Sequence, residues 1–189
     1  MSIVSPVKHI IFFTLILIGA CQTMDDGYFS ELANSGEVVI VLDDYELDEV
    51  PPEIELLSKA TDLRIVQDRG WQVYPPISFY PPLAKFPPPY RFLPDEITTL
   101  TQLQDLSISG LNLAELPQNF SQLKNLESLD LTHNKLNISA EWGKLKSLPK
   151  LREVTVIGNV VDTAEVHRWM DERPGLKVIY HWNDIKEEW

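Results

Sequence analysis

The sequence has very little cysteine: Cys21 is the only one among 189 residues. A single thiol can form neither an intrachain disulfide nor a paired-cysteine zinc site, so the fold must be stabilised by packing alone. Basic residues are scarce as well, with 16 Lys and Arg against 28 Asp and Glu and a formal net charge of −12. They do not cluster into a patch that could neutralise a run of phosphates, which argues against nucleic acid as a partner.

Catalytic motifs are also missing. The sequence contains no HExxH zinc motif, no GxSxG nucleophile elbow and no phosphate-binding glycine loop. His167 and Asp171 are four residues apart on an expected helix, but such a pair is more commonly a helix-surface contact than a catalytic pair. We therefore expect a protein that is not an enzyme, with no catalytic residue, metal site or cofactor. An enzyme is the least favoured alternative.

Apolar residues, in contrast, make up 44% of the chain, enough for one domain with a sizeable core. The first 20 residues contain one cation, Lys8, then an apolar run and small residues before Cys21, which is the order of a secretion signal. Ile18-Gly19-Ala20-Cys21 resembles the lipobox of bacterial lipoproteins. The resemblance implies cleavage before Cys21 and a lipid on its thiol. A cleaved signal peptide followed by an incidental cysteine is the alternative.

This resemblance predicts a lipoprotein signal peptide at 1–20 and a lipidated, palmitate-carrying tether at 21–35. Gln22 is not the aspartate that is associated with inner-membrane retention in enteric bacteria, so the resemblance points to the outer membrane. Either its periplasmic side or the cell surface is possible. Because the chain is acidic, anionic lipids would repel it, and we expect membrane contact through the lipid anchor only.

Internal repeats organise the rest of the chain. The segment around Leu106 recurs 23 residues later around Leu129, and again 25 residues later around Val154. The middle copy contains every apolar position and the asparagine, Asn134, of the pattern LxxLxLxxNxL, which resembles the signature of the leucine-rich repeat family. The first copy departs from the pattern, since Leu111 stands where asparagine is expected.

The resemblance implies an α/β leucine-rich repeat solenoid over 36–189, with about seven coils. Each coil would contribute a strand to a parallel concave sheet and a short helical or extended segment to the convex side, and a helix followed by a strand would cap the C-terminal end. Strand centres are expected near these residues: Ile40, Leu63, Leu106, Leu129, Val154 and Ile179.

One step between these centres, from Leu63 to Leu106, is long enough for an additional coil. The proline-rich segment 74–92 fills this gap, and we interpret it as a degenerate repeat that forms the seventh coil. Its prolines cannot donate to a central strand ladder, so most of it would lie off the sheet. A projecting loop is the first alternative, and a ligand for a proline-binding module is the second.

Function must come from the surface that the coils present. Strand residues that alternate with the leucines face the concave side, which should therefore be acidic and rich in hydroxyl groups, with an aromatic pair at one end. The candidate partner-binding residues are Asp105, Ser107, Ser109, Ser128, Asp130, Thr132, His133, Glu153, Thr155, Ile157, Tyr180 and Trp182. The earlier strands add Asp62 and Arg64 to the same face.

We expect this face to bind a protein, peptide or glycan, with Tyr180 and Trp182 as stacking or anchor contacts. Two alternatives remain open at this point. The face could be solvated and bind nothing, or the solenoid could be a structural component that packs into a larger envelope assembly.

Overall fold

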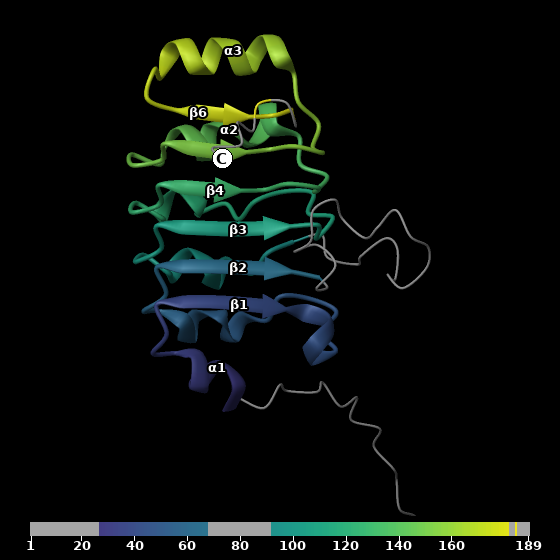
Figure 1. Cartoon of the computed structure of the whole chain (residues 1–189), viewed down its shortest axis with the longest axis vertical. Coiled ribbons are helices and arrows are strands. Elements are labelled where there is room, and N and C mark those ends of the chain that lie inside the picture. The colour runs from purple at the N-terminus through teal and green to yellow at the C-terminus, as the bar shows by residue number, and fades with distance from the viewer. Residues whose placement is uncertain (1–26, 68–91, 182–183, 185–189) are drawn as a thin grey trace, which may run out of the picture.

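A computed structural model describes residues 27–67, 92–181 and 184 of the chain. Six strands form one parallel sheet, and their order in the sheet is their order in the sequence (Figure 1). The strands are β1 Glu37–Val41, β2 Asp62–Val66, β3 Asp105–Ser109, β4 Ser128–Asp130, β5 Glu153–Thr155 and β6 Lys177–Ile179. This is the parallel α/β repeat architecture expected from the sequence.

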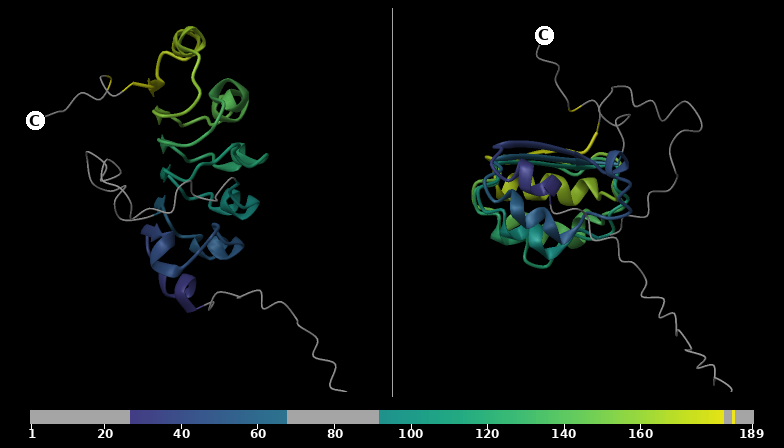
Figure 2. Two further views of the ribbon diagram at one scale, coloured as in Figure 1. Left: turned by 90° about the vertical axis from the view of Figure 1, so that its right-hand side faces the viewer. Right: turned by 90° about the horizontal axis from the view of Figure 1, so that it is seen from below.

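Most helical segments lie on the opposite side of the coils from the strands, as the edge-on view shows (Figure 2, left). The α-helices are α1 Gly27–Leu32, α2 Ile138–Lys146 and α3 Thr163–Glu172. Short 3-10 helices span Leu42–Tyr45, Pro52–Leu57, Asp95–Thr99 and Phe120–Gln122. No helix in the described part of the chain is long and apolar enough to cross a membrane.

The leucines of the repeat stack into one continuous core. Leu106 pairs in register with Leu129, and Leu129 pairs with Val154, so equivalent side chains of successive coils lie one above the other. All three are buried in the same hydrophobic cluster. Because strand side chains alternate between the two faces, the residues between them point to the concave side.

The buried asparagine of the repeat satisfies backbone groups that the turns leave without a partner. Asn134 is 1% exposed. Its Oδ1 accepts hydrogen bonds from the amides of Leu111 and Leu113, each at 3.2 Å, and its Nδ2 donates to the carbonyl of Ile108 at 2.8 Å. Asn159 repeats the arrangement one coil later, accepting from the amide of Leu136 at 3.1 Å. Both residues therefore have a structural role.

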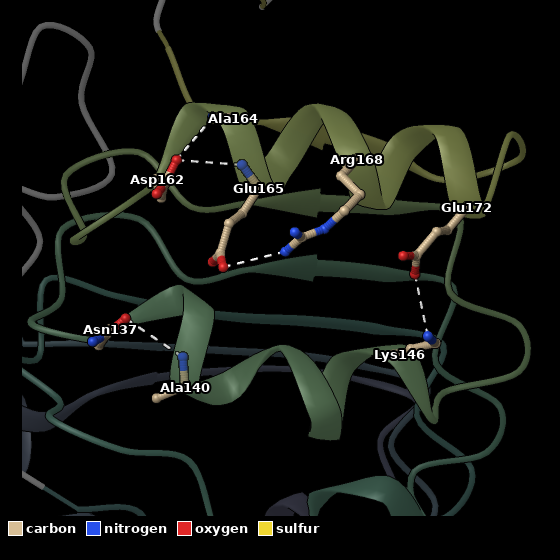
Figure 3. A network of polar contacts seen from close by, with 8 residues as sticks. All are labelled: Asn137, Ala140, Lys146, Asp162, Ala164, Glu165, Arg168 and Glu172. Carbon is tan, nitrogen blue, oxygen red and sulfur yellow. Dashed lines mark hydrogen bonds and ion pairs between the residues drawn. The ribbon is translucent and has the colours of Figure 1, made fainter.

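The two longer helices begin at side-chain caps (Figure 3). Asn137 Oδ1 accepts from the amide of Ala140, and Asp162 Oδ1 accepts from the amide of Ala164 at 2.9 Å. Such caps satisfy amide groups that have no partner within the helix. On α3, Val166 and Trp169 are buried, as expected for the apolar face of a C-terminal cap.

A partly buried ion pair attaches α2 to the preceding coil. Glu141 is 6% exposed and lies 2.9 Å from the ammonium group of Lys144. Glu141 Oε2 accepts from the amide of Leu116, and Lys144 Nζ donates to the carbonyl of the same residue at 2.6 Å. The pair therefore also binds both backbone groups of Leu116, which reduces the cost of burying the two charges.

The expectation of a seventh coil between Leu63 and Leu106 is wrong. β2 and β3 pair directly, with Asp62 opposite Asp105, 43 residues later. The next pair, Asp105 and Ser128, is separated by 23 residues, so the longer step is one coil with 20 additional residues. The proline-rich segment 74–92 falls almost wholly in 68–91, outside the described residues.

The N-terminal boundary also differs from the expected one. The sequence predicts a tether over 21–35, but residues 27–32 of that stretch form α1. Phe29 on this helix is fully buried and belongs to the core cluster. The repeat unit therefore begins before residue 36, because α1 covers core that β1 leaves open at this end.

The register of the last coil is shifted by one residue from the expected one. Val154 pairs with Val178, not with Ile179. Val178 consequently belongs to the core cluster, and Tyr180, two residues further along, packs against that cluster from the inner side. The predicted position of Tyr180 on the concave face is therefore wrong. Its hydroxyl lies 3.0 Å from Nε2 of His167 on α3.

Candidate functional site

The concave face consists of side-chain rows that run across the strands. One row, in register, contains Glu37, Asp62, Asp105, Ser128, Glu153 and Lys177. The next row contains Val39, Arg64, Ser107, Asp130, Thr155 and Ile179. The carboxylates therefore gather at the β1 to β3 end of the first row, and neighbouring strands bring them within about 5 Å of one another in the hydrogen-bonding direction.

The centre of this face is hollowed. A depression of about 350 Å³ lies over β2, β3 and β4, and its lining includes three carboxylates, one guanidinium group and three serines. The polar residues of the lining are Asp62, Arg64, Asp105, Ser107, Ser109, Ser128 and Asp130. The hollow therefore offers both hydrogen-bond acceptors and hydroxyl groups, with an excess of negative charge.

The three carboxylates of the hollow differ in how their charge is satisfied. Asp130 Oδ1 accepts from the amide of Thr132 at 2.9 Å and from its hydroxyl at 2.5 Å, while Oδ2 accepts from Ser107 at 3.2 Å. Asp62 and Asp105, in contrast, make no side-chain hydrogen bond or ion pair with any described residue. Asp130 thus shapes the wall of the hollow, and the two remaining carboxylates are available to a ligand.

The carboxylate of Glu153 is less available to a ligand than those of Asp62 and Asp105. Its Oε2 lies 2.9 Å from Nζ of Lys177 on the neighbouring strand, so its charge is compensated within the sheet. We expected an acidic surface from Asp105 through Asp130 to Glu153. The carboxylates of the hollow that remain without a partner among the described residues instead lie on β2 and β3. Asp62 and Arg64, which the sequence places on this face but not among the candidate binding residues, are part of the hollow.

Other candidate residues take different positions. Ser109, Ser128 and Thr155 lie on the concave face and are partly exposed, as predicted. Thr132 is 9% exposed and Ile157 is 4% exposed, so neither offers much contact surface. Cys21 and Trp182 lie outside the described residues.

His133 lies in the turn after β4 in a left-handed conformation, with φ of 55°. Gly158 of the next turn is so close that a Cβ on it would come within 2.7 Å of Nδ1 of His133. Burial lowers the pKa of His133, and the nearby carboxylate of Asp130 opposes this effect only in part. The imidazole is therefore predominantly neutral in the folded protein near pH 7, and adds no positive charge to the acidic face.

No part of the described structure suggests a reactive centre. No group of three or more His, Cys, Asp or Glu that could hold a metal ion occurs among the described residues. His167 contacts Tyr180, and it forms no hydrogen bond with Asp171. The repeats, the parallel sheet and the hollow together define a scaffold of stacked parallel coils that presents an extended surface on the strand side.

Comparison with known proteins adds short stretches of similarity. No family model matches the chain. The chain is 37% identical over 73 residues to Protein flightless-1 homolog of Caenorhabditis elegans, a stretch that covers 39% of this chain and 6% of that protein. It is 46% identical over 59 residues to Disease resistance-like protein DSC1 of Arabidopsis thaliana, covering 31% of this chain and 4% of the relative.

Among solved structures, a leucine-rich repeat protein of Leptospira interrogans superposes with a TM-score of 0.43 and 21% sequence identity. The match covers 69% of this chain and 34% of that one. All three similarities span only part of the proteins compared.

Proposed function

We propose that this chain is a non-catalytic, lipid-anchored recognition protein whose concave hollow binds a cationic segment of a protein partner. The observation that carries the proposal is the pair Asp62 and Asp105. They face each other in register across β2 and β3 and line the hollow, and neither carboxylate has a partner among the described residues. Adjacent carboxylates repel each other when the hollow is empty, and a bound lysine or arginine would relieve that repulsion.

The surrounding groups favour a peptide as the ligand. The serine hydroxyls of the hollow can donate to and accept from a backbone, and Arg64 can bind a carbonyl or an acidic side chain next to the cation. A hollow of about 350 Å³ is large enough for one long side chain and its backbone, but not for a folded domain.

The test is a pull-down from envelope extract with the full chain in detergent, comparing the parent with D62N/D105N. The matched control is E55Q/D95N, which removes the same charge from exposed 3-10 helices on the helical side of the coils. We expect partners to be lost, and the salt dependence of their capture to flatten, only with D62N/D105N. Recovery of the same partners by all three proteins would contradict the proposal and favour a structural role in the envelope.

The anchor is a separate part of the proposal and rests on the lipobox-like sequence that ends at Cys21. Cys21→Ala should abolish metabolic labelling with palmitate and release the protein from the membrane fraction. Normal lipid incorporation in that variant would contradict the anchor and leave the binding proposal intact. Proteolysis of intact cells then distinguishes surface display from a periplasmic position at the outer membrane.

A further inference from the structure

The sheet ends at β1, and the outer edge of this strand carries backbone groups that no other strand pairs with. The amide of Asp62 donates to the carbonyl of Gly36 at 3.0 Å, which sets the phase of the parallel ladder. In such a ladder Val38 and Ile40 bond to β2, so the N–H and C=O groups of Glu37 and Val39 and the N–H group of Val41 point outward, while the carbonyl of Val41 belongs to the start of the 3-10 helix Leu42–Tyr45. Among the described residues, none hydrogen-bonds to these outward groups.

The two ends of the sheet differ in how much edge they present. At β6 the amide of Lys177 donates to Arg152 and the carbonyl of Ile179 accepts from Val156, so of the residues of β6 only Val178 has outward groups. At β1 both backbone groups of Glu37 and Val39 and the N–H group of Val41 point outward. α1 lies at this end, but it packs against the 3-10 helix Pro52–Leu57 on the helical side of the coil. A long unpaired edge of this kind is a template for adding another strand.

The side chains beside this edge indicate the chemistry of the added strand. Val39, at the centre of β1, is 50% exposed. Glu37 is exposed and begins the row that continues through Asp62 and Asp105. At the other end of the same row, Lys177 neutralises Glu153 from the neighbouring strand at 2.9 Å. A cation on a strand added next to β1 would do the same for Glu37.

We propose that the β1 edge binds an extended basic segment of a partner protein as a seventh strand, with a Lys or Arg beside Glu37 and an apolar residue beside Val39. This surface is distinct from the hollow over β2 to β4, and the inference does not rest on the proposed function of that hollow. The added backbone would supply the acceptors and donors that Glu37, Val39 and Val41 lack, and its side chains would provide specificity.

A second copy of the chain fits this edge less well. Antiparallel pairing of two β1 strands about Val39 would place Glu37 opposite Val41 of the other copy and would bring no cation to the acidic row. Each copy also has a net charge of −12, so the two solenoids would repel each other. A basic segment removes both objections, and a self-paired dimer is an outcome that the test can detect.

The decisive variant is Val39→Pro. Proline lacks an N–H group, but the amide of Val39 points outward, so the substitution removes an edge donor without breaking a bond to β2. Val39→Thr, which keeps the amide, is the matched control. The probe is the fluorescein-labelled peptide Lys-Val-Val-Ile-Thr-Lys with blocked ends, and the control peptide has proline at its third position. Binding to the full chain in detergent is followed by fluorescence anisotropy.

We expect the parent and V39T to bind the probe, V39P to bind it at least tenfold more weakly with unchanged thermal unfolding, and E37Q to flatten the salt dependence. Hydrogen exchange should slow at the amides of Glu37, Val39 and Val41 when the probe binds. Equal binding by V39P would overturn the proposal, and so would a concentration-dependent dimer that V39P abolishes. Loss of binding in D62N/D105N but not in V39P would assign the probe to the hollow and reject the edge site, leaving the proposed function intact.

Discussion

The indole rings of Trp142 and Trp169 stack, with centroids 4.1 Å apart and planes 10° from parallel. Trp142 belongs to α2 and Trp169 to α3, so the stack joins the last regular coil to the helix that caps it. The contact matters because α3 closes a core that would otherwise end in water.

Replacing Trp169 with alanine should destabilise the protein by about 3 to 5 kcal/mol, since the substitution removes a large buried side chain and its stacking contact with Trp142. Trp169→Phe should cost clearly less because an aromatic ring remains against Trp142. Arg168→Ala, an exposed neighbour on the same helix, serves as the control. The free energy of unfolding comes from urea titration followed by circular dichroism, and equal losses for Trp169→Ala and Arg168→Ala would contradict the role of the stack.

The second prediction tests the alternation of the central strand. Leu129 is 1% exposed and packs between coils on both sides, so Leu129→Ala should cost roughly 2 to 5 kcal/mol. Ser128→Ala, one residue earlier and on the concave face, should change stability by less than about 0.5 kcal/mol. The same denaturant titration measures both, and similar losses would mean that the strand faces are assigned wrongly.

The third prediction concerns the asparagine ladder. Asn134→Ala leaves the amides of Leu111 and Leu113 without their acceptor inside the core, and should cost roughly 2 kcal/mol or more. Asn125 also hydrogen-bonds across coils, to the carbonyl of Thr101 at 2.8 Å, but at an exposed site. Water can replace that bond, so we expect Asn125→Ala to cost clearly less. A larger loss for Asn125→Ala would refute this interpretation.

The fourth prediction is a pH dependence of stability that originates at His133. Its pKa in the folded protein is below the ordinary value of 6.5, so the unfolded chain takes up the proton first as the pH falls. The stability contributed by the neutral imidazole is complete above about pH 6.5 and is lost progressively below it.

His133→Asn should flatten this part of the stability profile between about pH 7 and 5, since asparagine also tolerates the left-handed backbone at this position. His181→Asn, at an exposed histidine, is the control. Melting temperatures across the pH range provide the measurement. An unchanged slope in His133→Asn would show that other groups cause the acid sensitivity.

The sequence by itself determined the stack of parallel coils, because the apolar residues that form its core recur at regular intervals. Residues such as Leu106, Leu129 and Val154 recur at the spacing of one coil, and a coil can bury them only by stacking on its neighbours. The same periodicity placed Ser107 and Asp130 on the concave face. Each of these assignments depends on local alternation alone, which a short stretch of sequence contains in full.

Only the tertiary structure decided the features that depend on register between distant segments. The direct pairing of Asp62 with Asp105 removes the expected seventh coil, and the pairing of Val154 with Val178 turns Tyr180 from the concave face to the core. A one-residue change of register moves every side chain of a strand to the other face, and near-equal apolar neighbours such as Val178 and Ile179 do not distinguish the alternatives.

The tertiary structure also decides which carboxylates of the sheet have an ion-pair partner. In sequence, Glu153 and Asp105 look alike, as acids at equivalent positions of the repeat. In the structure Lys177 neutralises Glu153 from the next strand, whereas Asp105 faces Asp62. Which carboxylate remains available to a ligand is therefore decided by the strand that lies beside it, since Coulomb interactions act through space and not along the chain.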